Sequence, residues 1–484
     1  MAQIQNVRIS LGSRTTPFKI EHDPQLYEAY DAYLQRELKA KLGTAEILRW
    51  AVVGAKKDGF QVSLEIEATI LEGANFPKDP YRKEFSAKGN EISGPLFMHI
   101  VPTGVKAAIG GSLGDALPVN LVLSRLGTLL THPNTCNAGP LNFMDPLSTL
   151  YCEGKSLDDF ARGRCFVEPL NSRQGGLLRQ NKIAIILDDG MDEWSKQNVL
   201  YQINAFRAHT GAEILGCIWT KAPIGGHARK LVSGAFVGDV ENIDTLFDAV
   251  EEVRILGAEA VAIFTHIEVD EDHLVEYFKG EGANPFGGHE AIISHTVLSL
   301  LGIPAAHAPV LNRAEIDYVQ TRKNLSPEAA GEGAAPFYTY SVLRGLQYAP
   351  QLVSSEARRI SRSYALAFTS VSVILCPASS VGGVPMMRAH QLGIPIIGVK
   401  ENTTVLDVTS QNIGFKDIIV VENYLEAIGL FVHVFRTSGE IDLDHLQKAK
   451  RERSPEFLSL CGHDVAVSMG VDPTSLRRPL NSIF

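Results

Sequence analysis

The sequence predicts an α/β protein with mainly parallel sheet layers, flanking helices and a small α+β domain at the N-terminus. From about residue 97, short apolar runs such as KIAIILDDG and SVSVILCPASS alternate with helical segments such as QNVLYQINAFRAHTG. Strands buried on both faces of a parallel sheet read as such continuous apolar runs. In these sheets ligands bind beyond the carboxyl ends of the strands, so every loop that follows a strand is a candidate site.

The first 95 residues follow a different pattern. PQLYEAYDAYLQRELKAK, residues 24–41, has apolar side chains at helical spacing, and AVVGAKKDGFQVSLEIEATIL alternates on both sides of Lys57-Asp58-Gly59, as a hairpin does. We therefore expect a small α+β domain over 1–95. An α/β lobe over 96–310, a lid-like excursion over 311–340, a second α/β lobe over 341–450 and a peripheral tail over 451–484 follow it.

Composition excludes several classes of protein. The 484 residues are 45% hydrophobic with a formal charge of −10 and no long runs of like charge, which disfavours nucleic acid or an anionic membrane as a partner. The N-terminus lacks the pattern of a secretory signal, and no apolar run is long enough to span a bilayer. We expect a cytoplasmic protein, and a homo-oligomer is possible because cyclic dimers are common.

The stretch IGGSLGDALPVNLVL, residues 109–123, has a glycine turn ahead of a helix. Gly110, Gly111 and Gly114 fit neither dinucleotide-binding nor P-loop spacing. Gly110 and Gly111 are nevertheless candidates to bind a substrate at the rim of a ligand crevice. Asp115 is a candidate catalytic or ligand-facing residue, although helix capping explains it equally well.

The loop THPNTCNAGP crowds polar groups behind an apolar segment. His132 is a candidate acid or base, and Asn134 and Asn137 are candidates to orient a substrate; the alternative is that they satisfy turn backbone groups. In ILDDG, Asp188 is a candidate catalytic residue. Together with Asp189 it is also the best candidate for a divalent metal, if the protein uses one, although a capping turn explains the pair almost as well.

KGEGANPFGGHEAIISH, residues 279–295, has four glycines ahead of an apolar helix, with Glu290 near its first turn as a substrate-binding candidate. A zinc motif H-E-x-x-H is excluded, because residue 293 is Ile293. His295 and His307 lie in apolar surroundings, where histidines are more often core residues, but His307 follows an apparent strand and is a candidate acid or base.

A loop of small residues follows the strand-like run that ends at Cys376. Ser379, Ser380, Gly382 and Gly383 open a helix there, which allows a ligand oxyanion to approach backbone N–H groups. Glu401, in the polar loop after the next strand, is a further substrate-binding candidate.

Several motifs together resemble one uncharacterised family, known from cyanobacteria and other bacteria as domain of unknown function 3326. They are VPTGVKAAIGGSLGDALPV, THPN…NAG, YCEGKSLDDFARG, GAEAVA, NPFGGHEAIISH, IPAAHAP, LSPEAA and PASSVGG…VKENTT…NYLEAIG, over about residues 97–445. The resemblance implies no reaction. It implies that Cys136 and Cys376 are aliphatic in other members, which argues against a mechanism that needs both thiols.

These observations favour a small-molecule enzyme, with hydrolysis or ring opening of a small polar or anionic metabolite as the first choice of chemistry. One alternative is a cofactor-independent isomerase or racemase that uses Cys136 and Cys376, each of which lies close to the end of an apparent strand. Another is a non-catalytic sensor of a small ligand.

Overall fold

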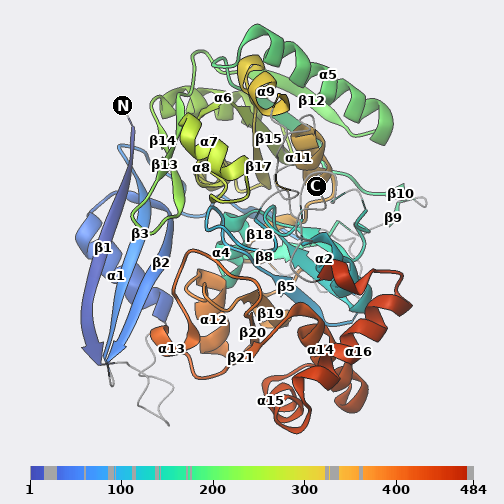
Figure 1. The fold of residues 1–484 in the computed structure, drawn as a ribbon. Coiled ribbons are helices and arrows are strands. Elements are labelled where there is room, and N and C mark those ends of the chain that lie inside the picture. Colours follow the sequence, from blue (N-terminus) through green and yellow to red (C-terminus); the bar gives the residue numbers. More distant parts are fainter. Residues whose placement is uncertain are drawn as a thin grey trace.

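The computed structural model describes residues 2–15, 30–58, 61–85, 92, 94–111, 116–136, 141, 143–170, 173–174, 177–321, 326, 337–358 and 364–476. It confirms the α/β class, with two parallel sheets, each flanked by helices, and a separate antiparallel sheet from the N-terminus. In Figure 1 the N-terminal sheet lies at the left, the four-stranded parallel sheet lies above, and the six-stranded parallel sheet lies below.

The N-terminal domain is an antiparallel sheet of order β1-β3-β2 that packs against helix α1. Its elements are β1 (Gln3–Thr15), α1 (Tyr30–Leu42), β2 (Glu46–Asp58) and β3 (Gln61–Glu72). Asp58 of β2 pairs with Gln61 of β3, which confirms the hairpin. Alternate side chains of β2 face inward, and Leu34 and Leu38 of α1 are fully buried in the same core, as the helical spacing predicts.

All six strands of the larger sheet run parallel. Strands β19 and β5 lie side by side at its centre, and the chain adds later strands outward from them, β20 and β21 on one side and β6 and β7 on the other. From one edge to the other it contains β21 (Ile418–Val421), β20 (Ile396–Val399), β19 (Val371–Pro377), β5 (Leu96–His99), β6 (Thr128–Thr131) and β7 (Thr149–Tyr151). Helix α2 (Leu117–Leu126) connects β5 to β6, and α12 (Val384–Leu392) connects β19 to β20. The loops after β5, β6 and β7 therefore meet at one edge of the sheet.

The four-stranded sheet is also parallel, with order β12-β11-β15-β17. Its strands are β11 (Ile183–Leu187), β12 (Ile214–Trp219), β15 (Ala260–Thr265) and β17 (Ala305–Pro309). The connecting helices include α5 (Glu193–Thr210), α6 (Ile243–Leu256), α7 (Glu271–Phe278) and α8 (Gly287–Leu301). Helix α5 begins where the Asp192 side chain accepts a hydrogen bond from Ser195 N, and it ends at Gly211, whose φ is +66°.

Apart from the three C-terminal helices, the remaining described elements are short or connect the lobes. They are β4 (Arg82–Glu84), α4 (Gly154–Ala161), β8 (Cys165–Glu168), β9 (Arg173–Gln174), β10 (Leu177–Leu178), β13 (Gly226–Lys230), β14 (Phe236–Val240), β16 (Ile267–Glu268), α9 (Arg313–Gln320), α11 (Phe337–Gln347), β18 (Gln351–Arg358), α13 (Ser410–Ile413) and the 3₁₀ turns Phe368–Ser370 and Pro473–Leu476.

The sheets divide the chain differently from the predicted lobes. Strands from 96–151 join strands from 371–421 in one sheet, whereas the other sheet takes strands from 183–309. The predicted excursion over 311–340 contains α9 and the start of α11; residues 322–325 and 327–336 lie outside the described residues.

The C-terminal helices pack closely against one another and against the hydrophobic core. Helices α14 (Tyr424–Ser438), α15 (Leu443–Glu452) and α16 (Pro455–Ser468) follow β21. A Cβ atom on Gly429 of α14 would lie 1.8 Å from the carbonyl oxygen of Leu458 in α16, so the two backbones are in contact. Leu458 is fully buried. The segment predicted as a peripheral tail therefore packs one face of α16 and the final 3₁₀ turn against the core, although most of its described residues are exposed. Residues 477–484 lie outside the described part.

Candidate functional site

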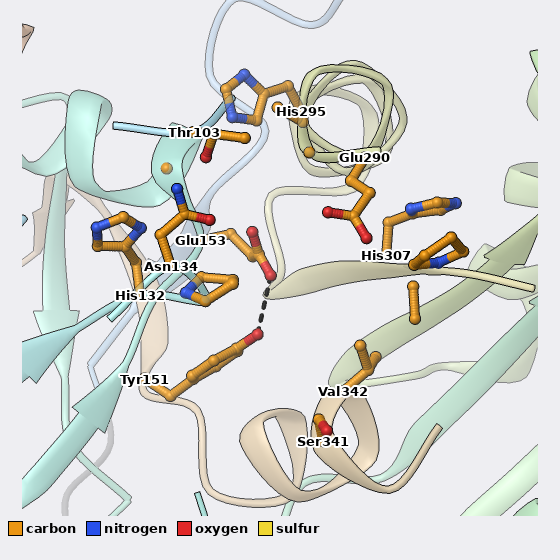
Figure 2. Close-up of a pocket in the computed structure, with 16 residues that line it drawn as sticks. Thr103, His132, Asn134, Tyr151, Glu153, Glu290, His295, His307, Ser341 and Val342 are labelled. Atoms are coloured by element: carbon orange, nitrogen blue, oxygen red, sulfur yellow. Dashed lines mark hydrogen bonds between the residues drawn. The ribbon is translucent and has the colours of Figure 1, made fainter. Parts of the chain in front are cut away.

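A pocket lies where the ends of β5, β6 and β7 face β17 and the first turn of α8 (Figure 2). Its volume of about 60 Å³ compares with roughly 10–15 Å³ for one water molecule measured in the same way, so a small ligand fits. The polar residues that line it are Thr103, His132, Asn134, Tyr151, Glu153, Glu290, His295, His307 and Ser341. The pocket therefore lies where the carboxyl-end rule for parallel sheets predicts.

His132 and Asn134 reach the pocket from the loop after β6. The backbone N–H of Val101 donates to His132 Nε2 at 2.9 Å, which places the ring proton on Nδ1. Asn134 Nδ2 donates to the carbonyl oxygen of Pro102 at 2.9 Å and to that of Val101 at 3.3 Å. These bonds tie the end of β6 to the end of β5. Burial lowers the pKa of His132 to about 3, so the ring is neutral at neutral pH.

Tyr151 and Glu153 follow β7. The Tyr151 hydroxyl donates to Glu153 Oε1 at 3.0 Å, the bond drawn as a dashed line in Figure 2. Burial raises the pKa of Glu153 to about 8, and the hydrogen bond from Tyr151 opposes that shift only in part. The Glu153 carboxyl is therefore mostly protonated at neutral pH. Helix α4 begins at the next residue, Gly154.

Helix α8 begins at the pocket because two glycines allow a close approach. A Cβ atom on Gly287 would lie 2.4 Å from Thr103 Cγ2, and one on Gly288 would lie 2.4 Å from the carbonyl oxygen of Phe236. The FGGHE motif thus serves close packing of the helix start against the loop after β5 and against β14. Glu290, in the first turn of α8 as predicted, lines the pocket.

The N-terminal domain supports α8 at two points. His295 Nδ1 hydrogen-bonds the carbonyl oxygen of Leu48 at 3.1 Å, and Arg49 Nη1 donates to the carbonyl oxygen of Gly288 at 3.3 Å. Because a carbonyl only accepts, the ring proton of His295 is on Nδ1 and its Nε2 is an acceptor on the side of Gly154. Burial, followed by the charge of Arg49, lowers the pKa of His295 to about 3.

His307 lines the pocket from β17. Its Nε2 hydrogen-bonds Thr265 Oγ1 at 2.7 Å, and its ring centroid lies 6.0 Å from that of His289. Among the residues described, Nδ1 of His307 has no hydrogen-bond partner. Burial lowers the pKa of His307 well below its usual value.

Asp188 and Asp189 lie outside the pocket, at the end of β11. The Asp188 carboxylate accepts hydrogen bonds from the backbone N–H groups of Gly190, Ile224 and His266, at 3.0, 2.9 and 3.3 Å. Asp189 pairs with Lys196 at 2.8 Å. Within the described ranges, no three His, Cys, Asp or Glu side chains are grouped to hold a metal ion.

The loop after β19 does not line the pocket. Ser379 Oγ lies 2.8 Å from Thr404 Oγ1, Ser380 is buried, and a Cβ atom on Gly382 would lie 2.8 Å from Val52 Cβ of the N-terminal domain. Gly383 is the N-cap residue of α12. The glycine at position 382 is thus explained by its close contact with β2, and not by an open site for an anion.

Glu401 accepts a hydrogen bond from the backbone N–H of Tyr424 at 2.7 Å, so it serves the start of α14 and not the pocket.

The glycine turn at 110–111 lies against the loop after β6. Gly110 has a φ of +74°, and a Cβ atom there would lie 2.9 Å from the carbonyl oxygen of Asn134. Gly111 is described as well, but neither glycine lines the pocket. Asp115 and Asn137 lie outside the described residues.

The two thiols of the isomerase hypothesis are not together. Cys136 and Cys376 are both fully buried, belong to different hydrophobic clusters and do not line the pocket. Burial raises the pKa of each to about 12, which suppresses the reactive thiolate.

Residues 97–445, more than half of the chain, match a family model described as protein of unknown function (DUF3326). The chain belongs to this family. A relative from Synechococcus, described as an uncharacterized lipoprotein, is 31% identical over 333 residues, which cover 68% of this chain and 88% of the relative. No solved structure matches the chain. All pocket residues named above fall inside the DUF3326 range, whereas Leu48 and Arg49 lie outside it.

The relative's description corrects one prediction. The sequence predicts a cytoplasmic protein, and a relative described as a lipoprotein contradicts it. The prediction depended on the absence of a signal pattern and of an apolar span, but a covalently attached lipid anchors a protein without a spanning helix. No helix in the described part of the chain is long and apolar enough to cross a membrane.

Sequence reasoning found four of the pocket residues as site candidates: His132, Asn134, Glu290 and His307. It missed Tyr151 and Glu153 and assigned His295 to the core. The missed signal was the short run TLYC, rich in residues that favour strands and followed directly by Glu153, the same pattern of a strand followed by a polar loop that singled out His132.

Proposed function

We propose that the protein is a small-molecule enzyme that uses general acid–base catalysis in this pocket, with hydrolysis or ring opening of a small polar metabolite as its chemistry. The observation that carries the proposal is the Glu153 carboxyl, which is protonated at neutral pH in a pocket shared with a second carboxyl, Glu290. Strongly shifted titratable groups in a cavity are typical of catalytic sites. Hydrolysis and ring opening both need a proton donor for the leaving atom and a proton acceptor for the attacking water or hydroxyl.

In this proposal the pocket residues have separate roles. Glu153 donates a proton to the departing atom, and Glu290 in its ionised form accepts one from the nucleophile. His132 and His295 are held as neutral rings in fixed tautomers, one with an N–H and one with a free acceptor nitrogen, so they orient substrate groups. Tyr151 holds the Glu153 carboxyl in place.

The test is untargeted mass spectrometry of a cell extract freed of macromolecules and incubated with the protein. We expect wild type to deplete at least one metabolite with formation of a matched product, and Glu153→Gln to slow this on the order of 10²- to 10⁴-fold. Glu252→Gln, the same change at an exposed position on α6, is the control and keeps full activity.

Equal turnover by Glu153→Gln and wild type would overturn the proposal. Retention of a metabolite by the protein without conversion would also overturn it, and would support a non-catalytic ligand sensor instead.

A further inference from the structure

Two helices begin at the pocket. Gly154 of α4 and Gly287 of α8 both line it, and neither helix has a side chain that caps its first turn. The first backbone N–H groups of a helix have no acceptor within the helix, and they carry a partial positive charge. Two such ends therefore meet at one small cavity, where their N–H groups can donate to the oxygen atoms of a ligand.

An independent observation points to a ligand at the same place. The His132 side chain lines the pocket and is 5% exposed. The N–H of Val101 occupies its Nε2, so Nδ1–H is the donor that remains on the ring, and no described residue accepts from it. A ligand oxygen in the pocket would satisfy this donor.

The two carboxyls of the pocket limit the charge of the ligand. Glu153 is mostly uncharged near neutral pH, because burial raises its pKa to about 8, and it repels an anion little. Glu290 lines the same pocket from the first turn of α8, so a second carboxyl lies beside the ligand. A singly charged group with two acceptor oxygens suits this balance better than a phosphate dianion.

We propose that the pocket binds the carboxylate of a small organic acid, whose oxygens accept hydrogen bonds from His132 Nδ1–H and from the first backbone amides of α4 and α8. The inference rests on the proposed function and names the substrate class of that site.

The test measures binding without turnover. The Glu153→Gln protein keeps an uncharged side chain of the same shape, and isothermal titration calorimetry at pH 7 compares pyruvate and lactate with their neutral amides, pyruvamide and lactamide. We expect saturable binding of at least one acid, and at least tenfold weaker binding of its amide.

A second variant tests the donor. Adding His132→Gln to Glu153→Gln should weaken acid binding at least tenfold, whereas adding His433→Gln, at a partly exposed position on α14 distant in the fold, should change it less than twofold. The comparison of acid with amide needs no change at His132, so it stands even if that variant fails to fold.

Amides that bind as tightly as the acids, or no binding of either acid to the folded Glu153→Gln protein, would overturn the inference. Different outcomes would overturn this inference and the proposed function. A Glu153-dependent conversion of an uncharged metabolite would overturn only the carboxylate, whereas carboxylate binding with no conversion by wild type would overturn only the catalysis.

Discussion

Asp188, a candidate catalytic residue from the sequence, lies where it was predicted, but its hydrogen bonds give it a structural role. The sequence places it at the end of a strand, and β11 ends at Leu187. Its buried carboxylate accepts hydrogen bonds from three backbone amides of three different segments, so it joins the loops at the end of the four-stranded sheet.

We expect Asp188→Asn to destabilise the protein by about 1–3 kcal/mol, because an amide group replaces one acceptor oxygen beside the donors. The midpoint of thermal unfolding should fall accordingly, while Asp248→Asn, at an exposed position on α6, leaves it unchanged. Loss of turnover in Asp188→Asn at an unaltered unfolding midpoint would instead support the catalytic role predicted from the sequence.

The pocket residues show what a sequence reveals about a site and what it does not. His132, Asn134, Glu290 and His307 were identifiable because each lies next to an apparent strand or helix start. That they meet could not be predicted, because the meeting depends on β5–β7 facing β17 across two sheets. The protonated state of Glu153 depends on burial by residues distant in sequence, so it leaves no local signal.

At the scale of elements, the contact between α14 and α16 depends on two glycines. A Cβ atom on Gly462 would lie 2.0 Å from the carbonyl oxygen of Leu425, matching the contact at Gly429. Isolated glycines in helical segments do not reveal such a crossing in a sequence. The polar start of the segment after residue 450, KAKRERSPEF, predicts a peripheral tail instead.

We expect Gly429→Ala to lower stability by at least about 1–3 kcal/mol, because one added methyl forces the two backbones apart. Differential scanning calorimetry measures the effect, and Thr437→Ala on the exposed side of α14 is the control. An unchanged melting temperature in Gly429→Ala would show that the helices cross less closely than described.

At the scale of the whole molecule, buried histidines dominate the response to acid. Burial lowers the pKa of five of them: His99 to about 4, His132 to about 3, His289 to about 4, His295 to about 3, and His307 well below its usual value. Four described carboxyls act in the opposite direction, because burial raises the pKa of Glu153 to about 8, that of Asp158 to about 6, and those of Glu67 and Asp188 above the usual value.

Between pH 6.5 and about 4 the unfolded chain therefore binds more protons than the folded chain, and stability falls as the pH falls. Each histidine contributes up to about 1.4 kcal/mol per pH unit to the slope. Thermal unfolding at pH 7, 6 and 5 should show a steadily decreasing midpoint. A midpoint that stays level or rises toward pH 5 would contradict the neutral state of these rings.

The α/β class of the whole molecule could be predicted from the sequence, but the assignment of its strands to the two parallel sheets could not. Continuous apolar runs identify strands of a parallel sheet, yet they are too alike to show which strands are neighbours. SVSVILCP pairs with LFMH, more than 250 residues earlier, and because of this long-range pairing the six-stranded sheet takes strands from both predicted lobes, whereas the four-stranded sheet lies within the first.

The two contacts from β2 to α8 connect a segment outside the family range to the pocket. The pocket lies within the family range, but Leu48 and Arg49, which hold the ring of His295 and the first turn of α8, come from a segment outside that range. Substitutions at Leu48 or Arg49 would therefore have effects on activity similar to those of substitutions in the pocket, although these two residues touch no ligand. The N-terminal domain therefore contacts the site through α8, without contributing a lining residue to the pocket.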